Sequence, residues 1–185
     1  MSTENHLRSQ RWQLLISRIE REYQQLSEAE RNWIAGRLRQ IETLQQQLHQ
    51  LFIRGQGERV CADCLGGCCA RGHNHMTLAN LLGYLKIGKR PPPPDFSRTC
   101  PFLSDTGCQL PVIHRPYNCI SFVCDIIEEN LIQEELADFY SIERQLRGLY
   151  QQFAERHAGA SLTGLLIQEQ RLGNRDFFSR KQRPT

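Results

Sequence analysis

Every cysteine of the chain lies between residues 61 and 124. They form three groups: Cys61, Cys64, Cys68 and Cys69; then Cys100 and Cys108; then Cys119 and Cys124. Thiolate sulfur is a preferred ligand of zinc and of iron–sulfur clusters. The chain begins without a basic region followed by an apolar run, so it shows no secretory signal. In a reducing compartment, thiols set so closely indicate metal ligands rather than disulfides. We therefore expect the eight cysteines to form a metal-binding module.

Two glycine-containing turns accompany these cysteines. The run Leu65-Gly66-Gly67 has the backbone freedom of a metal knuckle and lets amide groups point at sulfur. Gly107 is expected at the strained position of a second turn, directly before Cys108. Adjacent Cys68 and Cys69 cannot easily pair with each other, because a disulfide needs a specific separation and dihedral angle. Which of these two thiols is a ligand is left open.

The spacing leaves the number of sites and the metal open. Eight cysteines suffice for two four-thiolate sites, or for one site with spare or redox thiols. Only Cys61-x2-Cys64 has the form of a zinc knuckle. Four cysteines within nine residues, with others arriving from far along the chain, are closer to an iron–sulfur arrangement. The spacing favours an iron–sulfur centre over structural zinc, and either of them over disulfides or free core thiols.

Residues 115–124 carry the last two thiols. Pro116 is suited to open a short helix that contains Cys119. A regular helix continuing to Cys124 would not aim both thiols at one point, since they are five residues apart. We therefore expect a break between them or a second ion. Arg115 is expected to offset the negative charge of a thiolate centre.

Three histidines are alternative ligands near the cysteines. His73 and His75 follow Cys69 closely, and His114 directly precedes Arg115. Neutral imidazole binds zinc and iron. Histidines in polar loops are more often solvated, and that is the interpretation we favour for all three.

The ordered set of cysteine motifs resembles the YkgJ-like cysteine-cluster family, whose members are described as chelating zinc or iron. The resemblance covers about residues 58–126, and it implies that all eight cysteines bind metal. The family pattern often has an Ile-Tyr pair after Gly-Cys, where this chain has Leu110-Pro111-Val112 nearby and a longer gap to Arg115. The family fixes neither the metal nor a reaction. The motifs that carry the resemblance are Cys61-x2-Cys64-x3-Cys68-Cys69, Cys100-Pro-Phe-Leu, Gly107-Cys108 and Arg115-Pro116-x2-Cys119-x2-Phe122-x-Cys124.

Helical segments flank the cysteine module. An apolar stripe predicts a helix over residues 7–26, and Ser27 with Glu30 forms the capping-box pattern that begins a second helix, which runs to about residue 52. We expect these two helices to form an antiparallel hairpin. Glycine accepts the left-handed conformation of a helix end, so the second helix should stop in the run Gly55-Gln56-Gly57.

The remaining chain continues the helical pattern. Apolar spacing predicts a short helix over residues 76–87, a long helix over residues 125–157 that stops near Gly159, and a short helix over residues 161–172. The prolines at 91–94 must be extended. The basic end of the chain, from residue 175, is expected to be frayed.

The expected fold is therefore mainly α. A helical hairpin over residues 1–56 packs as a small bundle with the third long helix, which lies with the basic tail in residues 127–185. The irregular, cysteine-rich metal-binding module, residues 57–126, stands between the second and third helices.

Composition narrows the possible functions. The net charge of +3 and pI near 8.5 are too mild to indicate nucleic-acid binding, and no apolar run is long enough to span a bilayer. The sequence has no P-loop and no nucleophile elbow, and it leaves enzymatic activity and oligomeric state open. We expect a cytoplasmic protein that holds an iron–sulfur cluster for redox chemistry, iron handling or a redox-linked modification. The alternative is a structural-zinc adaptor, and in either case the helical segments would bind a protein partner.

Overall fold

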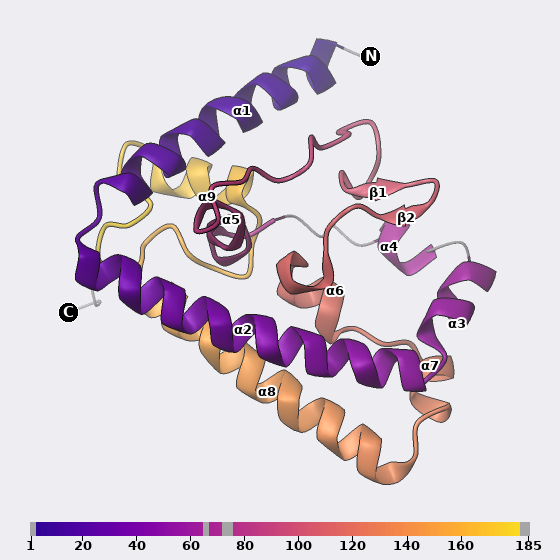
Figure 1. The fold of residues 1–185 in the computed structure, drawn as a ribbon. Helices are drawn as coiled ribbons and strands as arrows, with labels where there is room; N and C mark the ends of the chain where they lie inside the picture. The colour runs from indigo at the N-terminus through magenta and orange to yellow at the C-terminus, as the bar shows by residue number, and fades with distance from the viewer. Residues whose placement is uncertain (1–2, 65–66, 72–75, 182–185) are drawn as a thin grey trace.

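A computed structural model describes residues 3–64, 67–71 and 76–181, and it confirms a mainly helical fold (Figure 1). A single two-stranded antiparallel sheet accompanies the helices in this part of the chain. In chain order the elements are α1 (Thr3–Gln24), α2 (Glu28–Arg54), α3 (Gly57–Asp63), α4 (Gly67–Arg71), α5 (Leu78–Leu85), β1 (Leu103–Ser104), β2 (Gly107–Cys108), the 3-10 turn η1 (Val112–His114), α6 (Tyr117–Ser121), α7 (Asp125–Glu129), α8 (Gln133–Arg156) and α9 (Leu165–Leu172). None of the described helices is long and apolar enough to cross a membrane.

Helices α2 and α8 pack side by side and form the main framework (Figure 1). Both carry the apolar stripe that their sequences predict. Its buried members are Ile34, Leu38, Ile41, Leu48 and Leu51 on α2 and Phe139, Leu146, Leu149, Tyr150 and Phe153 on α8. These residues belong to one hydrophobic core that also takes in residues of the cysteine module.

Helix α1 diverges from α2 instead of lying antiparallel along it, so the expected close hairpin seam does not form (Figure 1). The stripe of α1 faces other partners. The Trp12 ring packs edge-on against Phe96 and Phe102, with ring centroids 6.4 and 6.1 Å apart. Arg11 forms an ion pair with Glu169 of α9 at 2.6 Å. Phe96 and Phe102, which precede β1, therefore pack against α1 where the sequence predicts α2.

Helix α5 is the central element of the core. All of its residues are buried, as expected of a helix that is apolar on every side. Its one strongly polar side chain, Asn80, accepts a hydrogen bond from the Thr77 hydroxyl at 2.6 Å and so closes the start of the helix.

Helix α2 ends where the sequence predicts, but a different residue adopts the left-handed backbone conformation. Gly55 caps the helix with an ordinary φ of −71°, and the left-handed residue is Gln56, with φ of 58°. Gly55 is needed for space instead, because a Cβ atom there would lie 2.8 Å from Cγ2 and 2.9 Å from the carbonyl oxygen of Ile127. The glycine therefore lets α7 approach the end of α2 closely.

The helix predicted over residues 125–157 is interrupted. Helix α7 ends at Glu129, Ile132 is extended, and α8 begins at Gln133. The side-chain amide of Asn130 donates to the Gly55 carbonyl oxygen at 3.0 Å, which fastens the break to the end of α2. Periodicity alone could not reveal this break, because the residues around it contain neither proline nor glycine.

The basic C-terminal segment is docked up to residue 180, contrary to the expected fraying. Phe177 is fully buried, and its backbone amide donates to the Glu22 carboxylate at 2.7 Å. Gly159, which we expected to act as a helix stop, faces this segment: a Cβ atom there would lie 2.3 Å from the Phe177 ring. Helix α8 has already ended at Arg156.

Replacing Gly55 by alanine should lower the free energy of unfolding by about 1–3 kcal/mol, since the new methyl group overpacks against Ile127. Gly36, inside α2, is the matched control, because nothing lies within 4 Å of its Cβ position. Gly36→Ala should instead stabilise the protein by up to about 1 kcal/mol through helix propensity. Urea unfolding followed by circular dichroism measures both. Equal effects of the two substitutions would contradict the assigned close approach.

Candidate metal centre

The cysteines are carried by short elements: α3 and α7 lie at the end of α2, and α6 packs against α2 (Figure 1). Cys61 lies in α3, Cys64 caps that helix, and Cys68 and Cys69 lie in α4. Cys100 precedes β1 and Cys108 is in β2, while Cys119 lies in α6 and Cys124 begins α7. Folding thus gathers three sequence groups into one region.

All eight cysteines are free thiols. Cys100 is buried, whereas Cys64, Cys68, Cys69 and Cys108 are exposed. The other three are half-buried. The region is therefore a surface module whose inner side reaches the core.

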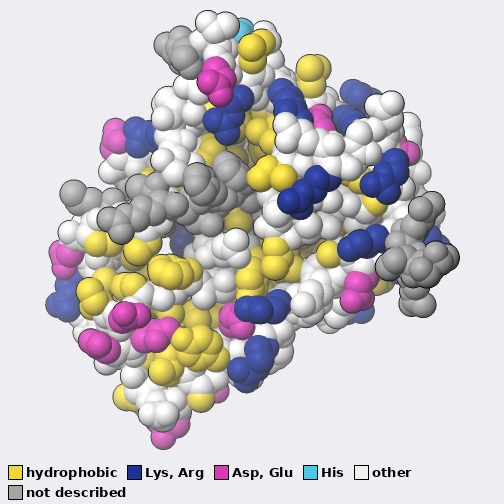
Figure 2. All heavy atoms as spheres, turned by 180° about the vertical axis from the view of Figure 1, so that it is seen from behind, with side chains coloured by type: hydrophobic (Ala, Val, Ile, Leu, Met, Phe, Trp, Pro, Cys, Tyr) yellow, Lys and Arg dark blue, Asp and Glu magenta, His cyan; other side chains and the backbone are white. Residues whose placement is uncertain are grey.

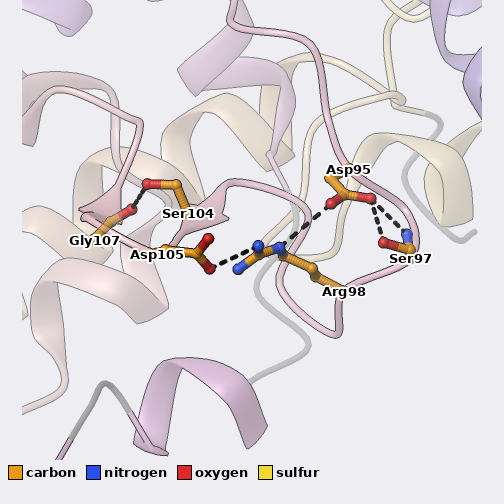
Figure 3. Close-up of polar contacts among 6 residues, drawn as sticks. All are labelled: Asp95, Ser97, Arg98, Ser104, Asp105 and Gly107. Carbon is orange, nitrogen blue, oxygen red and sulfur yellow. Dashed lines mark hydrogen bonds and ion pairs between the residues drawn. The ribbon is translucent and has the colours of Figure 1, made fainter.

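The β1–β2 hairpin holds Cys100 and Cys108 across a turn. Cys108 pairs with Leu103, and Gly107 pairs with Ser104. Gly107 has φ of +110°, which confirms its predicted strained position. The Ser104 hydroxyl donates to the Gly107 carbonyl oxygen at 2.8 Å and tightens the turn (Figure 3).

Arg98 braces the same hairpin from outside. Its guanidinium lies between two carboxylates, 3.3 Å from Asp95 and 2.8 Å from Asp105 (Figure 3). The Asp95 carboxylate also accepts a hydrogen bond from the Ser97 hydroxyl at 2.6 Å. These contacts are exposed, so their contribution to stability is small, but they link the two ends of the turn that contains Cys100.

The first thiol neighbourhood surrounds Cys61. Burial, together with the negative charges of neighbouring thiolates, raises the pKa of the Cys61 thiol to about 11. A thiol with this pKa is protonated at neutral pH unless a cation stabilises its thiolate. The neighbouring thiols are Cys64, Cys69, Cys124 and Cys68.

A second neighbourhood joins Cys69 to the hairpin and to α6. Although the Cys69 residue is exposed by surface area, the surrounding protein partly desolvates its thiol and raises its pKa, and the charges of Cys100 and Cys108 add to the effect. Burial likewise raises the pKa of Cys119, with contributions from Cys108, Cys100 and Cys69. Cys69 therefore lies within electrostatic reach of both Cys61 and the hairpin cysteines, Cys100 and Cys108. Cys119 interacts with the hairpin cysteines and with Cys69.

Two features counteract this build-up of negative charge. The positive charge of Arg115 partly offsets the raised pKa of both Cys69 and Cys119. The Leu103 backbone amide donates to the Cys100 carbonyl oxygen at 3.2 Å. The backbone amides of Phe102 and Leu103 also lower the pKa of the Cys100 thiol, although burial outweighs them. Amide groups pointed at sulfur are typical of metal-bound thiolates.

Arg115 is fixed by a buried polar network that the bundle supplies. Its carbonyl oxygen accepts hydrogen bonds from Gln45 of α2 at 2.6 Å and from Asn80 of α5 at 2.8 Å. The Asn80 amide also contacts the Tyr150 hydroxyl of α8 at 2.9 Å. The Arg115 guanidinium donates to the Leu110 carbonyl oxygen at 3.2 Å. The core thus determines where this cation stands.

Sequence reasoning missed this network, although one signal was present. Gln45 stands between Ile41 and Leu48 in the apolar stripe of α2 and is fully buried. A polar residue in such a stripe needs a buried partner. The identity of the partner, a carbonyl group seventy residues away, is not encoded locally.

The break expected between the last two cysteines is present. Helix α6 ends at Ser121, Phe122 is extended with φ −94° and ψ 124°, and Cys124 begins α7. Tyr117 donates to Glu143 of α8, which fastens α6 to the bundle. Cys119 and Cys124 therefore project from separate helices.

Of the three histidines, the structure describes only His114, and it differs from the expectation. His114 is buried rather than solvated, and its ring packs on Tyr84 with centroids 4.2 Å apart. Burial lowers its pKa, with Glu42 and Lys86 as the neighbouring charges rather than thiols. It is therefore a core histidine. His73, His75 and the Leu65-Gly66 part of the expected knuckle lie outside the described residues.

The thiols approach one another without reaching ligand geometry. Among residues 3–64, 67–71 and 76–181, no group of three or more His, Cys, Asp or Glu side chains is arranged so that it could hold a metal ion.

Comparison with family models, with curated proteins and with solved structures found no match to this chain. The resemblance to the YkgJ-like family therefore rests on the spacing of its cysteines.

Proposed function

We propose that the protein is a metal-binding protein whose eight cysteines hold iron, as an iron–sulfur centre. The observation that supports this most is the gathering of eight free thiols from three chain segments into one region. Unpaired thiols this close together escape oxidation to disulfides only in a reducing compartment. A cytoplasmic location is therefore part of the proposal. An iron–sulfur centre would supply electron transfer, iron handling or a redox-linked modification.

The electrostatic neighbourhoods favour two sets of four thiolates. One set would be Cys61, Cys64, Cys68 and Cys124. The other would be Cys69, Cys100, Cys108 and Cys119. This division gives the adjacent pair, Cys68 and Cys69, one ligand in each set. Both thiols affect Cys61, but only Cys69 also interacts with the hairpin thiols Cys100 and Cys108, so we assign Cys69 to the hairpin set and Cys68 to the set of Cys61. Four thiolates are the ligand number of a zinc ion or of an iron–sulfur cluster.

Anaerobic purification tests the proposal. The protein should be coloured, with absorbance that bleaches on reduction, and it should contain iron and acid-labile sulfide in equal amounts. A colourless protein with stoichiometric zinc would reject the iron assignment but keep the thiolate centre. A protein without metal, whose eight thiols all react with an alkylating reagent in the native state, would reject both.

Structural zinc is the second candidate, and the hairpin favours it. Cys100 lies at a turn where the backbone amides of Phe102 and Leu103 lower the pKa of its thiol, as in a zinc knuckle. In that case the protein is an adaptor without redox chemistry, and its helices bind a protein partner. Chelation should then unfold the cysteine module without any spectral change in the visible range.

Replacing Arg115 by methionine should weaken metal binding about tenfold or more, the usual cost of losing a group that supports metal ligands. Without the nearby positive charge, the pKa of the Cys69 and Cys119 thiols rises. Protons then compete more strongly with the metal for these two sulfur atoms. Competition against a chelator, with cobalt as the spectroscopic probe, measures the affinity. Arg59→Met, an exposed arginine of α3, is the control and should have less than a twofold effect. Equal affinities of the Arg115 variant and the wild type would contradict the role of this cation.

A further inference from the structure

Helix α7 and the start of α8 expose an unusual number of large apolar side chains. Phe122 is 58% exposed, Ile126 is 60%, Ile132 is 61% and Tyr140 is 41%. Single exposed apolar residues are common, but several on adjoining elements indicate an interaction surface. We call these four residues the α7–α8 patch. Figure 2 shows hydrophobic side chains interspersed with acidic ones over this part of the molecule, at the lower left of the view.

The charge around the α7–α8 patch has one sign. Residues 122–140 contain six acidic residues and no lysine or arginine, although the whole chain has a net charge of +3. The acidic residues are Asp125, Glu128, Glu129, Glu134, Glu135 and Asp138. The adjoining elements contribute two exposed arginines, Arg54 and Arg59, and only Arg54 forms an ion pair here, with Glu135 at 3.3 Å.

The patch is presented on a fixed support. On the inner side of α7, Ile127 is buried against Gly55, and Asn130 donates to the carbonyl oxygen of the same glycine. On the outer side, the Tyr140 hydroxyl donates to Glu128 and ties α8 to α7. The exposed apolar side chains therefore belong to an ordered surface, which lowers the entropic cost of docking.

We propose that the α7–α8 patch docks a basic protein partner that inserts an apolar side chain between lysine or arginine residues. The apolar centre supplies buried area, and the acidic rim supplies attraction and orientation. The same charge repels nucleic-acid phosphates and anionic lipid headgroups. Cys124 lies between Phe122 and Ile126 in the chain, so the partner would bind beside the cysteine module. The docking goes beyond the proposed function and does not require bound metal.

A synthetic amphipathic peptide of lysine and leucine, labelled with a fluorophore, serves as the probe, and fluorescence anisotropy measures its binding to the full chain. We expect binding at low salt that weakens about tenfold or more at 0.5 M salt, as charge attraction is screened. A peptide with glutamate in place of lysine should not bind. Equal binding of the two peptides, or no binding of either, overturns the proposal.

Paired variants locate the binding. Ile126→Ser with Ile132→Ser, and separately Glu129→Lys with Asp138→Lys, should each weaken binding about tenfold or more. The controls are Leu14→Ser, an apolar residue of α1 that is 72% exposed, and Glu155→Lys, at the far end of α8. Circular dichroism confirms that each variant is folded. Equal losses in patch and control variants overturn the proposal. So does a wild-type dimer, seen by sedimentation velocity, that the Ile126/Ile132 variant dissociates, because the patch would then belong to a second copy.

Discussion

Cys68→Ser and Cys69→Ser should each remove about half of the bound metal, and the double variant should remove all of it. The expectation follows from the division of the eight thiols into two sets of four, with one member of the adjacent pair in each. A site that loses one of four thiolates loses most of its affinity, because the replacing hydroxyl is neither charged nor soft. Elemental analysis of the purified variants, per mole of chain, measures the effect.

The spatial origin of the two thiols predicts a further difference. Both Cys68 and Cys69 affect Cys61 of α3, but Cys69 also shares a neighbourhood with the hairpin and with Cys119 of α6. Cys119→Ser should therefore match Cys69→Ser in the amount of metal lost, and Cys124→Ser should match Cys68→Ser. Asn118→Ser, an exposed neighbour of Cys119 on α6, is the control and should keep the full metal content. A single variant that loses all metal, or none, contradicts the division.

Replacing Asn80 by leucine should lower the free energy of unfolding by about 2–4 kcal/mol, since it leaves buried polar groups without partners. The Asn80 amide contacts the Arg115 carbonyl oxygen and the Tyr150 hydroxyl, and Tyr150 is itself buried. Leucine keeps the branching of the asparagine side chain but is larger, so overpacking adds to the loss of hydrogen bonds. Urea unfolding measures the change.

A double-mutant cycle separates the network from its parts. Gln45 and Asn80 both donate to the Arg115 carbonyl oxygen, so Gln45→Leu and Asn80→Leu should not be additive. Asn32→Leu, exposed on α2, is the matched control and should change stability by less than about 0.5 kcal/mol. If Asn80→Leu were as mild as this control, the network could not be what positions Arg115.

The helices could be predicted because their stripes are local properties. Leu38 and Ile41 of α2 and Phe139 and Leu146 of α8 are buried as their spacing indicates. The partners of the stripes could not be predicted. Trp12 has the spacing of a helix-packing residue, yet it packs on Phe96 and Phe102, and the pattern of α1 does not specify that choice.

Interruptions and glycine roles were also beyond local reasoning. The break before α8 depends on Asn130 reaching the end of α2, a contact made only in the folded chain. Gly55 and Gly159 were expected as helix stops, but both are required because another element passes close to the backbone. In contrast, Gly107 was predicted correctly, since the geometry of a four-residue turn is local.

For the cysteine module, the sequence indicated which residues come together but not how they are organised. The spacing indicated that the cysteines act together and that Cys119 and Cys124 cannot share one regular helix, and the structure has that break. The spacing could not assign neighbours, because Cys69 meets the hairpin thiols only after α4 and the hairpin have folded against each other. His114 shows the same limit, since its burial depends on Tyr84 of α5.

X-ray absorption spectroscopy, at the edge of whichever metal the anaerobically purified protein retains, tests the central claim most directly. The account predicts a first shell of sulfur atoms at about 2.3 Å, without a substantial nitrogen or oxygen contribution. A shell dominated by nitrogen or oxygen, or a protein that retains no metal, would show that the eight thiols do not form a metal centre.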